Sequence, residues 1–269
     1  MFRSKTPTPR ETRLIYIHIY KCGGSSMRRY IEEHLVDSGT TYLDHWAYMW
    51  EPDVSPGDRL LGNVMRSEEL RLGPLRNPTG STVVTTHCFF YEWMKRLDGF
   101  SFATMLRDPI RRVVSQFNFE QRVFDRHKDQ SLVDFVDGIS SYEFNLQTAA
   151  LCGSPRLDIG PIDLEQAKAN LHMFDSIGFV ETFDESLRLF DKIFGIETGT
   201  AAPTENVSPE GSPLPDWLVE LLKERCAYDL ELYEYAQRLY LGKVAALELL
   251  ETDNRDTPPP VFRTGQPPS

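Results

Sequence analysis

The chain has 269 residues, of which 41% are hydrophobic and 26% are charged, and 29 basic against 40 acidic residues give a formal net charge of −11. These values are typical of a globular protein that buries a core, and they argue against a fibrous or wholly disordered chain. The acidic balance also argues against a nucleic-acid partner, because binding to phosphate backbones needs a surplus of Lys and Arg.

The two ends of the sequence differ in composition from its centre. Residues 1–12 are polar and contain Pro, which predicts a flexible lead-in, and residues 251–269 are Pro-rich, which predicts a disordered tail. Residues 13–250 show no repeat or linker and are expected to form one domain. The sequence has no run of about 18 apolar residues and no apolar secretory segment, so we expect no transmembrane segment and a cytoplasmic protein with reduced cysteines.

Short apolar runs alternate with helical patterns along the chain. Four runs rich in β-branched and aromatic residues predict buried strands at Leu14–Ile19, Thr82–Thr86, Phe100–Leu106 and Ser176–Val180. Helical spacing predicts helices after the first and third runs, at Leu164–Phe174, at Glu185–Phe194 and from Pro215 onward with Trp217 facing inward. This order predicts a single α/β domain with a central, mainly parallel β-sheet flanked by helices. Ligands of such sheets bind beyond the carboxyl ends of the strands, in the loops that follow them.

The loop after the first strand reads HIYKCGGSS and resembles a phosphate cradle. Gly23 and Gly24 allow a sharp turn with accessible N–H groups, and the following helix directs further N–H groups and its positive dipole end to the same place. Ser25 and Ser26 add hydroxyl donors, and Lys21 adds a positive charge. The lysine precedes the glycines, so the loop is not the Walker A motif of nucleotide hydrolases. A plain strand-to-helix turn with a Ser N-cap is the alternative.

The loop after the third strand is a second candidate anion site. Arg107 ends the strand, and Asp108 and Pro109 are typical of a helix start, which leaves the guanidinium at the sheet edge to bind an oxyanion. Ser115 lies two helical turns further on, where it can share that anion. Residues 101–130 carry six basic against four acidic residues, a local positive balance in an acidic chain.

Together the two loops resemble the phosphosulfate-binding loops of sulfotransferases that use 3′-phosphoadenosine 5′-phosphosulfate (PAPS). The resemblance is strongest to the carbohydrate group, sulfotransferase family 2, which includes the heparan sulfate 2-O- and 6-O-sulfotransferases and bacterial relatives. That family has H-I-P-K-T-G-G-T-S where this chain has HIYKCGGSS, and L-R-D-P-hydrophobic-x-R-hydrophobic-x-S where it has LRDPIRRVVS. Further similar stretches are TTHCF at 85–89, NLQTAALCG at 145–153, GFVETFDESL at 178–187 and ENVS at 205–208, so the resemblance spans roughly residues 14–240.

The resemblance implies a P-loop-NTPase-like sulfotransferase fold, PAPS as sulfuryl donor and PAP, adenosine 3′,5′-bisphosphate, as product. Residues 21–26 would hold the 5′-phosphosulfate, and Arg107 and Ser115 the 3′-phosphate. Tyr20 replaces the usual proline, and Cys22 replaces the usual threonine, so only the backbone N–H of Cys22 is expected to contribute. A helix N-terminus and Lys21 would lower the pKa of the Cys22 thiol and make it reactive.

His87 directly follows the second predicted strand and is the candidate general base. A neutral imidazole suits that role near neutral pH, and in the family a histidine at the matching place has it. Lys21 is expected to stabilise the departing phosphate oxygen. A buried structural histidine is the alternative for His87, with Glu92 as the next candidate base. His18 is expected inside the first strand, either in the core or just behind the site residues, and the other histidines have no supporting context. His, Cys and Asp lack metal-ligand spacing, so no metal is expected.

The acceptor is the least determined part of the prediction. Candidate acceptor segments are residues 40–80, with Trp46, Tyr48, Trp50 and Pro52, and residues 118–160, with Arg122, Arg126, His127 and Lys128. An acidic protein is a poor partner for a long polyanion, which favours a smaller hydroxylated acceptor: a saccharide, a glycolipid or another metabolite. The alternatives are a P-loop-like kinase or nucleotide hydrolase, and a non-catalytic nucleotide-binding protein of the same fold. The sequon at residues 206–208 is expected in a loop near the cofactor.

Overall fold

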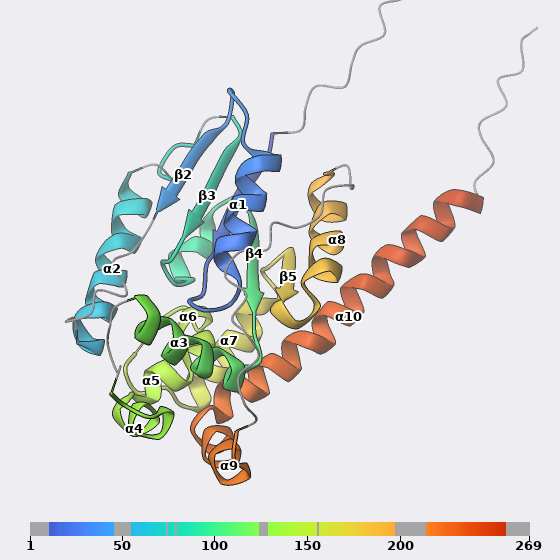
Figure 1. Ribbon diagram of the computed structural model, residues 1–269. Helices are drawn as coiled ribbons and strands as arrows, with labels where there is room; N and C mark the ends of the chain where they lie inside the picture. The colour runs from blue at the N-terminus through green and yellow to red at the C-terminus, as the bar shows by residue number, and fades with distance from the viewer. Residues whose placement is uncertain are drawn as a thin grey trace, which may run out of the picture.

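A five-stranded parallel sheet forms the centre of the computed structural model, which describes residues 11–45, 55–73, 75–78, 80–123, 129–154, 156–196 and 214–256 (Figure 1). The strands are β1 (Arg13–Ile17), β2 (Thr41–His45), β3 (Thr82–Thr86), β4 (Ser101–Leu106) and β5 (Ser176–Phe179). Their order in the sheet is β2-β3-β1-β4-β5, and every neighbouring pair is parallel. The predicted α/β class with a parallel sheet is therefore confirmed.

The register brings the candidate loops to one edge of this sheet. Ile17 at the end of β1 pairs with Thr86 at the end of β3 on one side and with Thr104 in β4 on the other. Thr86 pairs in turn with His45, the last residue of β2. The residues that follow β1, β3 and β4 therefore emerge side by side.

Helices cover both faces of the sheet and its carboxyl edge. Their bounds are α1 (Gly24–Leu35), α2 (Pro56–Leu72), α3 (Pro109–Val123), α4 (Leu132–Gly138), α5 (Ser141–Phe144), α6 (Leu146–Leu151), α7 (Pro161–Leu171), α8 (Phe183–Phe194), α9 (Asp216–Arg225) and α10 (Ala227–Asp256), with 3₁₀ turns η1 (Glu92–Arg96) and η2 (Val180–Thr182). Alternating strand residues separate two cores, because successive side chains point to opposite faces. Leu14 and Tyr16 pack with α1 and α8, whereas Ile15 and Ile17 share a larger core with α6, α7 and α10.

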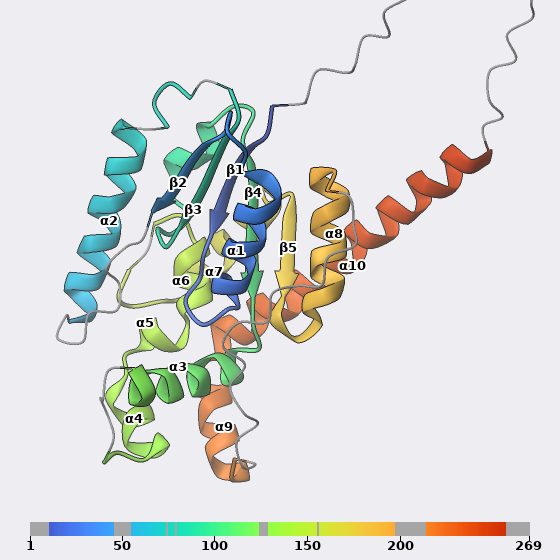
Figure 2. The same ribbon diagram turned by 45° about the horizontal axis from the view of Figure 1, so that its top comes forward.

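A third apolar cluster lies beside the carboxyl edge, where α3, α4 and α9 pack together. Figure 2 shows these helices grouped below the sheet. The helix α10 starts there, crosses the domain and extends beyond it in both views (Figures 1 and 2).

Several predicted boundaries need correction. The first strand ends at Ile17, so His18 lies just outside the strand, although its N–H still donates to the carbonyl of Thr86 at 2.7 Å. The strand β2 was not predicted, because TYLDH lacks a continuous apolar run. The predicted helix from Pro215 is two helices, α9 and α10, separated at Cys226. Trp217 was predicted to face inward, but it is 57% exposed, while Leu218 and Leu222 from the same helix are buried.

The predicted acceptor segments are largely regular structure. Residues 40–80 contain β2 and α2, and residues 118–160 contain the end of α3 and the helices α4, α5 and α6. Their aromatic residues at 46–52, their basic residues at 126–128 and the sequon at 206–208 lie outside the described residues. The helix α10 continues through residues 251–256, so the helical region ends later than composition predicts, and residues 257–269 are not described.

Within the described part of the chain, no helix is both long enough and apolar enough to cross a membrane.

Candidate active site

The loop between β1 and α1 turns sharply through two residues with positive φ. Gly23 has φ 70°, and Lys21, with φ 64°, is the one non-glycine residue among those described that adopts a positive φ. Such a conformation is strained for a residue with a Cβ, and strain of this kind concentrates at functional sites. The Cys22 N–H donates to the Ile19 carbonyl at 3.2 Å and closes the turn. The helix α1 then begins at Gly24, so its N-terminus presents backbone N–H groups at the sheet edge.

The expected reactivity of Cys22 is wrong in this structure. The side chain is fully buried, and its thiol donates to the Tyr20 carbonyl and to Gln147 Oε1. Burial raises the pKa of the Cys22 thiol to about 12, and the cations Arg112 and Arg107 only partly oppose this rise. Desolvation of the thiolate therefore outweighs the nearby positive charges.

Lys21 lies in a positive and aromatic environment. Its ammonium is 4.0 Å from the ring centroid of Phe119 on α3 and 5.5 Å from that of Tyr20. Burial, followed by repulsion from Arg107 and Arg122, lowers the pKa of Lys21 to about 8. A bound anion would relieve this repulsion, so the site fits a negatively charged ligand.

Arg107 joins the first loop to the third. Its Nη1 donates to the Lys21 carbonyl at 3.2 Å, so the two predicted anion loops are in direct contact. Its Nε is buried and makes no hydrogen bond within the described chain, and burial lowers the pKa of the guanidinium. A buried donor without a partner costs free energy, which an oxyanion ligand would recover.

The backbone of Arg107 is held by an amide that the sequence analysis did not single out. Gln147 Oε1 accepts from the Arg107 N–H, and Gln147 Nε2 donates to the Arg107 carbonyl, both at 2.9 Å. The same Oε1 accepts from the Cys22 thiol, so this side chain contacts both loops. Gln147 is anchored by the fully buried Asp229 of α10, which accepts from the Gln147 N–H at 3.0 Å. The only sequence signal was its place in the family-like stretch at 145–153.

Ser115 is buried on α3, two turns beyond Arg107 as predicted. Within the described residues no hydrogen bond joins the two side chains. The neighbouring Arg112 is fully buried; it donates to Gln116 Oε1 and to the Glu143 carbonyl. Arg112 therefore belongs to the interior of the domain rather than to a solvated basic face.

His87 follows β3 directly, as expected, and is buried at the sheet edge. Burial lowers the pKa of its imidazole to about 4, with Asp44 raising it and Arg28 and His45 lowering it further. The imidazole is therefore neutral at pH 7. His45, which the sequence analysis left without a role, lies at the end of β2, where its carbonyl accepts from the His87 N–H at 3.3 Å.

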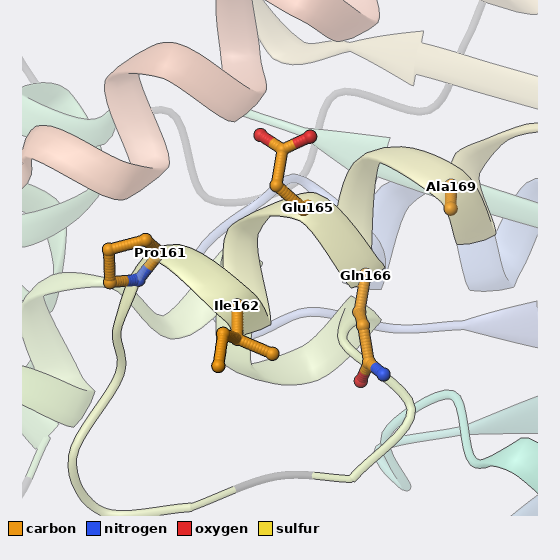
Figure 3. A pocket seen from close by; sticks show the side chains of 5 residues that line it. All are labelled: Pro161, Ile162, Glu165, Gln166 and Ala169. Carbon is orange, nitrogen blue, oxygen red and sulfur yellow. The ribbon is translucent and has the colours of Figure 1, made fainter.

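Other candidate positions do not join this site. Glu92, the alternative base, begins η1 and pairs with Lys95 at 2.7 Å on the surface. The described residues contain no cluster of three or more His, Cys, Asp or Glu side chains arranged for a metal ion. An open depression of about 420 Å³ lies on α7 (Figure 3) and contains none of the predicted site residues. It is lined by Pro161, Ile162, Glu165, Gln166 and Ala169.

The fold and the edge geometry define an α/β protein with two joined candidate anion loops and a neutral histidine. A model of the sulfotransferase family matches residues 7–236, and the chain belongs to that family. No curated protein matches it. A similar solved structure is the mouse sulfotransferase SULT7A1 complexed with PAP, which is 16% identical with a TM-score of 0.41. That match covers 71% of this chain and 61% of the mouse chain, so this chain spans less than two thirds of the relative.

Proposed function

We propose that the protein transfers the sulfuryl group of PAPS to a hydroxyl of its acceptor. The contact that carries this proposal is the hydrogen bond of Arg107 to the Lys21 carbonyl, because it joins two cationic loops at the sheet edge. PAPS has two separated phosphate positions, and two joined anion loops suit such a ligand. The family match supports the same reaction class.

In this proposal the backbone N–H groups at residues 23–26, the Ser25 and Ser26 hydroxyls and Lys21 hold the 5′-phosphosulfate. Arg107 and Ser115 hold the 3′-phosphate. Cys22 shapes the loop, since its N–H and thiol are used internally. Sulfuryl transfer needs an aligned acceptor oxygen and positive charge at the departing oxygen, so positioning and electrostatics dominate.

His87 acts as the general base in this proposal. The acceptor oxygen forms a bond to sulfur while the bond from sulfur to the 5′-phosphate oxygen breaks. The imidazole of His87 takes the acceptor proton, and the ammonium of Lys21 stabilises the negative charge left on the 5′-phosphate. A neutral His87 is required at the start, and its burial keeps it neutral. Electrons and protons balance without a metal.

The proposed acceptor is a small hydroxylated molecule, such as a saccharide or glycolipid headgroup, rather than a long polyanion. The net charge of −11 repels an extended anionic chain, whereas the cationic groups gather in the small area of Lys21 and Arg107. Screening [³⁵S]PAPS against hydroxylated acceptors identifies the substrate.

Nucleotide preference tests the proposal directly. We expect PAP to raise the melting temperature much more than ATP with Mg²⁺, because only PAP carries a 3′-phosphate for Arg107. Thermal unfolding at matched nucleotide concentrations measures this difference. Equal shifts, or a larger shift with ATP, would favour the kinase or hydrolase alternative.

Arg107→Ala tests the assignment of the 3′-site. We expect PAP binding to weaken by about 1.5–3 kcal/mol, the value of a charge-assisted hydrogen bond, and the preference for PAP over adenosine 5′-monophosphate to disappear. Titration calorimetry with both nucleotides measures the effect. Arg111→Ala, at an exposed position in the first turn of the following helix α3, is the control and should bind normally. If Arg107→Ala still prefers PAP over adenosine 5′-monophosphate, the 3′-phosphate is bound by other residues.

A further inference from the structure

A second imidazole packs against the proposed base. The rings of His18 and His87 have centroids 4.0 Å apart and are inclined by 35°. Both side chains are buried, and they meet because the ends of β1 and β3 are neighbours in the sheet. The sequence predicts His18 inside the first strand, either in the core or just behind the site residues, but it does not predict its contact with His87.

The ring of His18 also contacts the nucleotide loop, that is, the loop between β1 and α1. A Cβ built on Gly24 would lie 1.7 Å from Cδ2 and 1.9 Å from Nε2 of His18, so the ring fills the space that a side chain at this position would need. Gly24 is the first residue of α1. The imidazole of His18 thus contacts both the start of that helix and the ring of His87.

The backbone of His87 is fixed independently from α2. Asn63 Nδ2 donates to the His87 carbonyl, and Asn63 Oδ1 accepts from the Phe89 N–H, both at 3.0 Å. This bidentate contact restrains the residues on either side of Cys88. The ring of His87 is then held by its own side-chain contacts, which include the packing against His18.

We propose that His18 is a positioning residue that holds the His87 ring and couples its orientation to occupation of the nucleotide loop. The inference rests on the proposed role of His87 as base. Any movement of the first turn of α1 on anion binding presses on His18, because Gly24 leaves no gap. His18 passes that movement to His87 through the contact between the two rings. The base is then aligned when donor is present.

The charged groups around His18 and His87 also link the two rings to nucleotide binding. His87 is faced by Asp44 and His45 from β2 and by Arg28 from α1, and His18 is faced by His87, Arg28 and Lys21. Burial and these groups lower the pKa of His18 well below its ordinary value. An anion at the loop would offset the field of Lys21 and Arg28, so nucleotide binding should raise the pKa of the pair.

The test compares His18→Ala with His18→Phe, which keeps an aromatic face but no titratable group. In protein labelled with ¹⁵N-histidine, we expect PAP to shift the His87 ring signals of the wild type. In His18→Ala, PAP should bind within about threefold of wild type, while the His87 shift is lost. That variant should also lose at least tenfold in kcat, with little change in KM for PAPS. We expect His18→Phe to recover kcat to within a few-fold.

Three results would overturn the inference: unchanged kcat in His18→Ala, an equal loss in His18→Phe, or a wild-type His87 signal that does not respond to PAP. The last result needs no variant, so the inference can be overturned even if His18→Ala fails to fold. Failure of the proposed role of His87 as the base is separate. It would appear as full turnover in His87→Gln, whatever the His18 variants do.

Discussion

Replacing His87 with Gln should lower turnover by 10²–10⁴-fold, the usual contribution of a general base. Gln keeps a polar side chain of similar length, but it has no basic nitrogen to take the acceptor proton. PAP affinity should stay close to wild type, because the proposed nucleotide contacts come from Lys21 and Arg107. Transfer of label from [³⁵S]PAPS to an acceptor found by screening measures turnover, and calorimetry measures PAP affinity.

His45→Gln is the matched control for this variant. His45 lies at the same edge, one strand further out, and its contact with His87 is through its backbone carbonyl, which the substitution preserves. We expect at most a few-fold loss of turnover. If His87→Gln keeps turnover within tenfold of wild type, another residue takes the proton.

Acidification should destabilise the protein through its buried histidines. The pKa of His87 is lowered from 6.5 to about 4, so the unfolded state binds more protons than the folded state between these values. The stability that the neutral imidazole contributes is complete above pH 6.5 and is lost as the pH falls towards 4. One such group corresponds to about 3 kcal/mol between pH 7 and pH 4. The lowered pKa of His18 acts in the same direction.

Urea unfolding at pH 7, 5.5 and 4.5 measures this dependence. His87→Phe should make the unfolding free energy less dependent on pH, because the replacement removes the titrating group. This holds whatever the effect of the replacement on stability at pH 7. His172→Gln, which changes an exposed histidine, should keep the wild-type dependence. If the unfolding free energy of His87→Phe depends on pH as steeply as that of the wild type, His87 is not the buried neutral group assigned here.

The sequence predicted the candidate loops well because their signals are local. Glycines next to a lysine, and an Arg-Asp-Pro turn, each report on a few neighbouring residues between a strand and a helix. The four apolar strands were also found, since strands of a parallel sheet are buried on both faces and read as continuous apolar runs. The strand β2 has a polar and half-exposed sequence. Its role as an edge strand could therefore not be predicted, and neither could the position of His45.

The partners of the site were decided only by tertiary structure. Asn63 and Gln147 lie 24 and 40 residues from the backbones that they hold, and no local pattern marks either amide. The pKa of Cys22 shows the same limit: its neighbours in sequence predict a reactive thiol, while its burial raises the pKa to about 12.

The α/β class, the candidate loops after β1 and β4 and the position of His87 follow from the sequence, because each depends on strand burial or turn chemistry over a short stretch. The contact of Arg107 with the Lys21 loop, and the packing of the His18 ring against His87 in the space left by the missing Cβ of Gly24, follow only from the tertiary structure. These contacts depend on the strand order β2-β3-β1-β4-β5, which sets which carboxyl ends are neighbours. Strand order is fixed by packing across the whole domain, and no single segment encodes it.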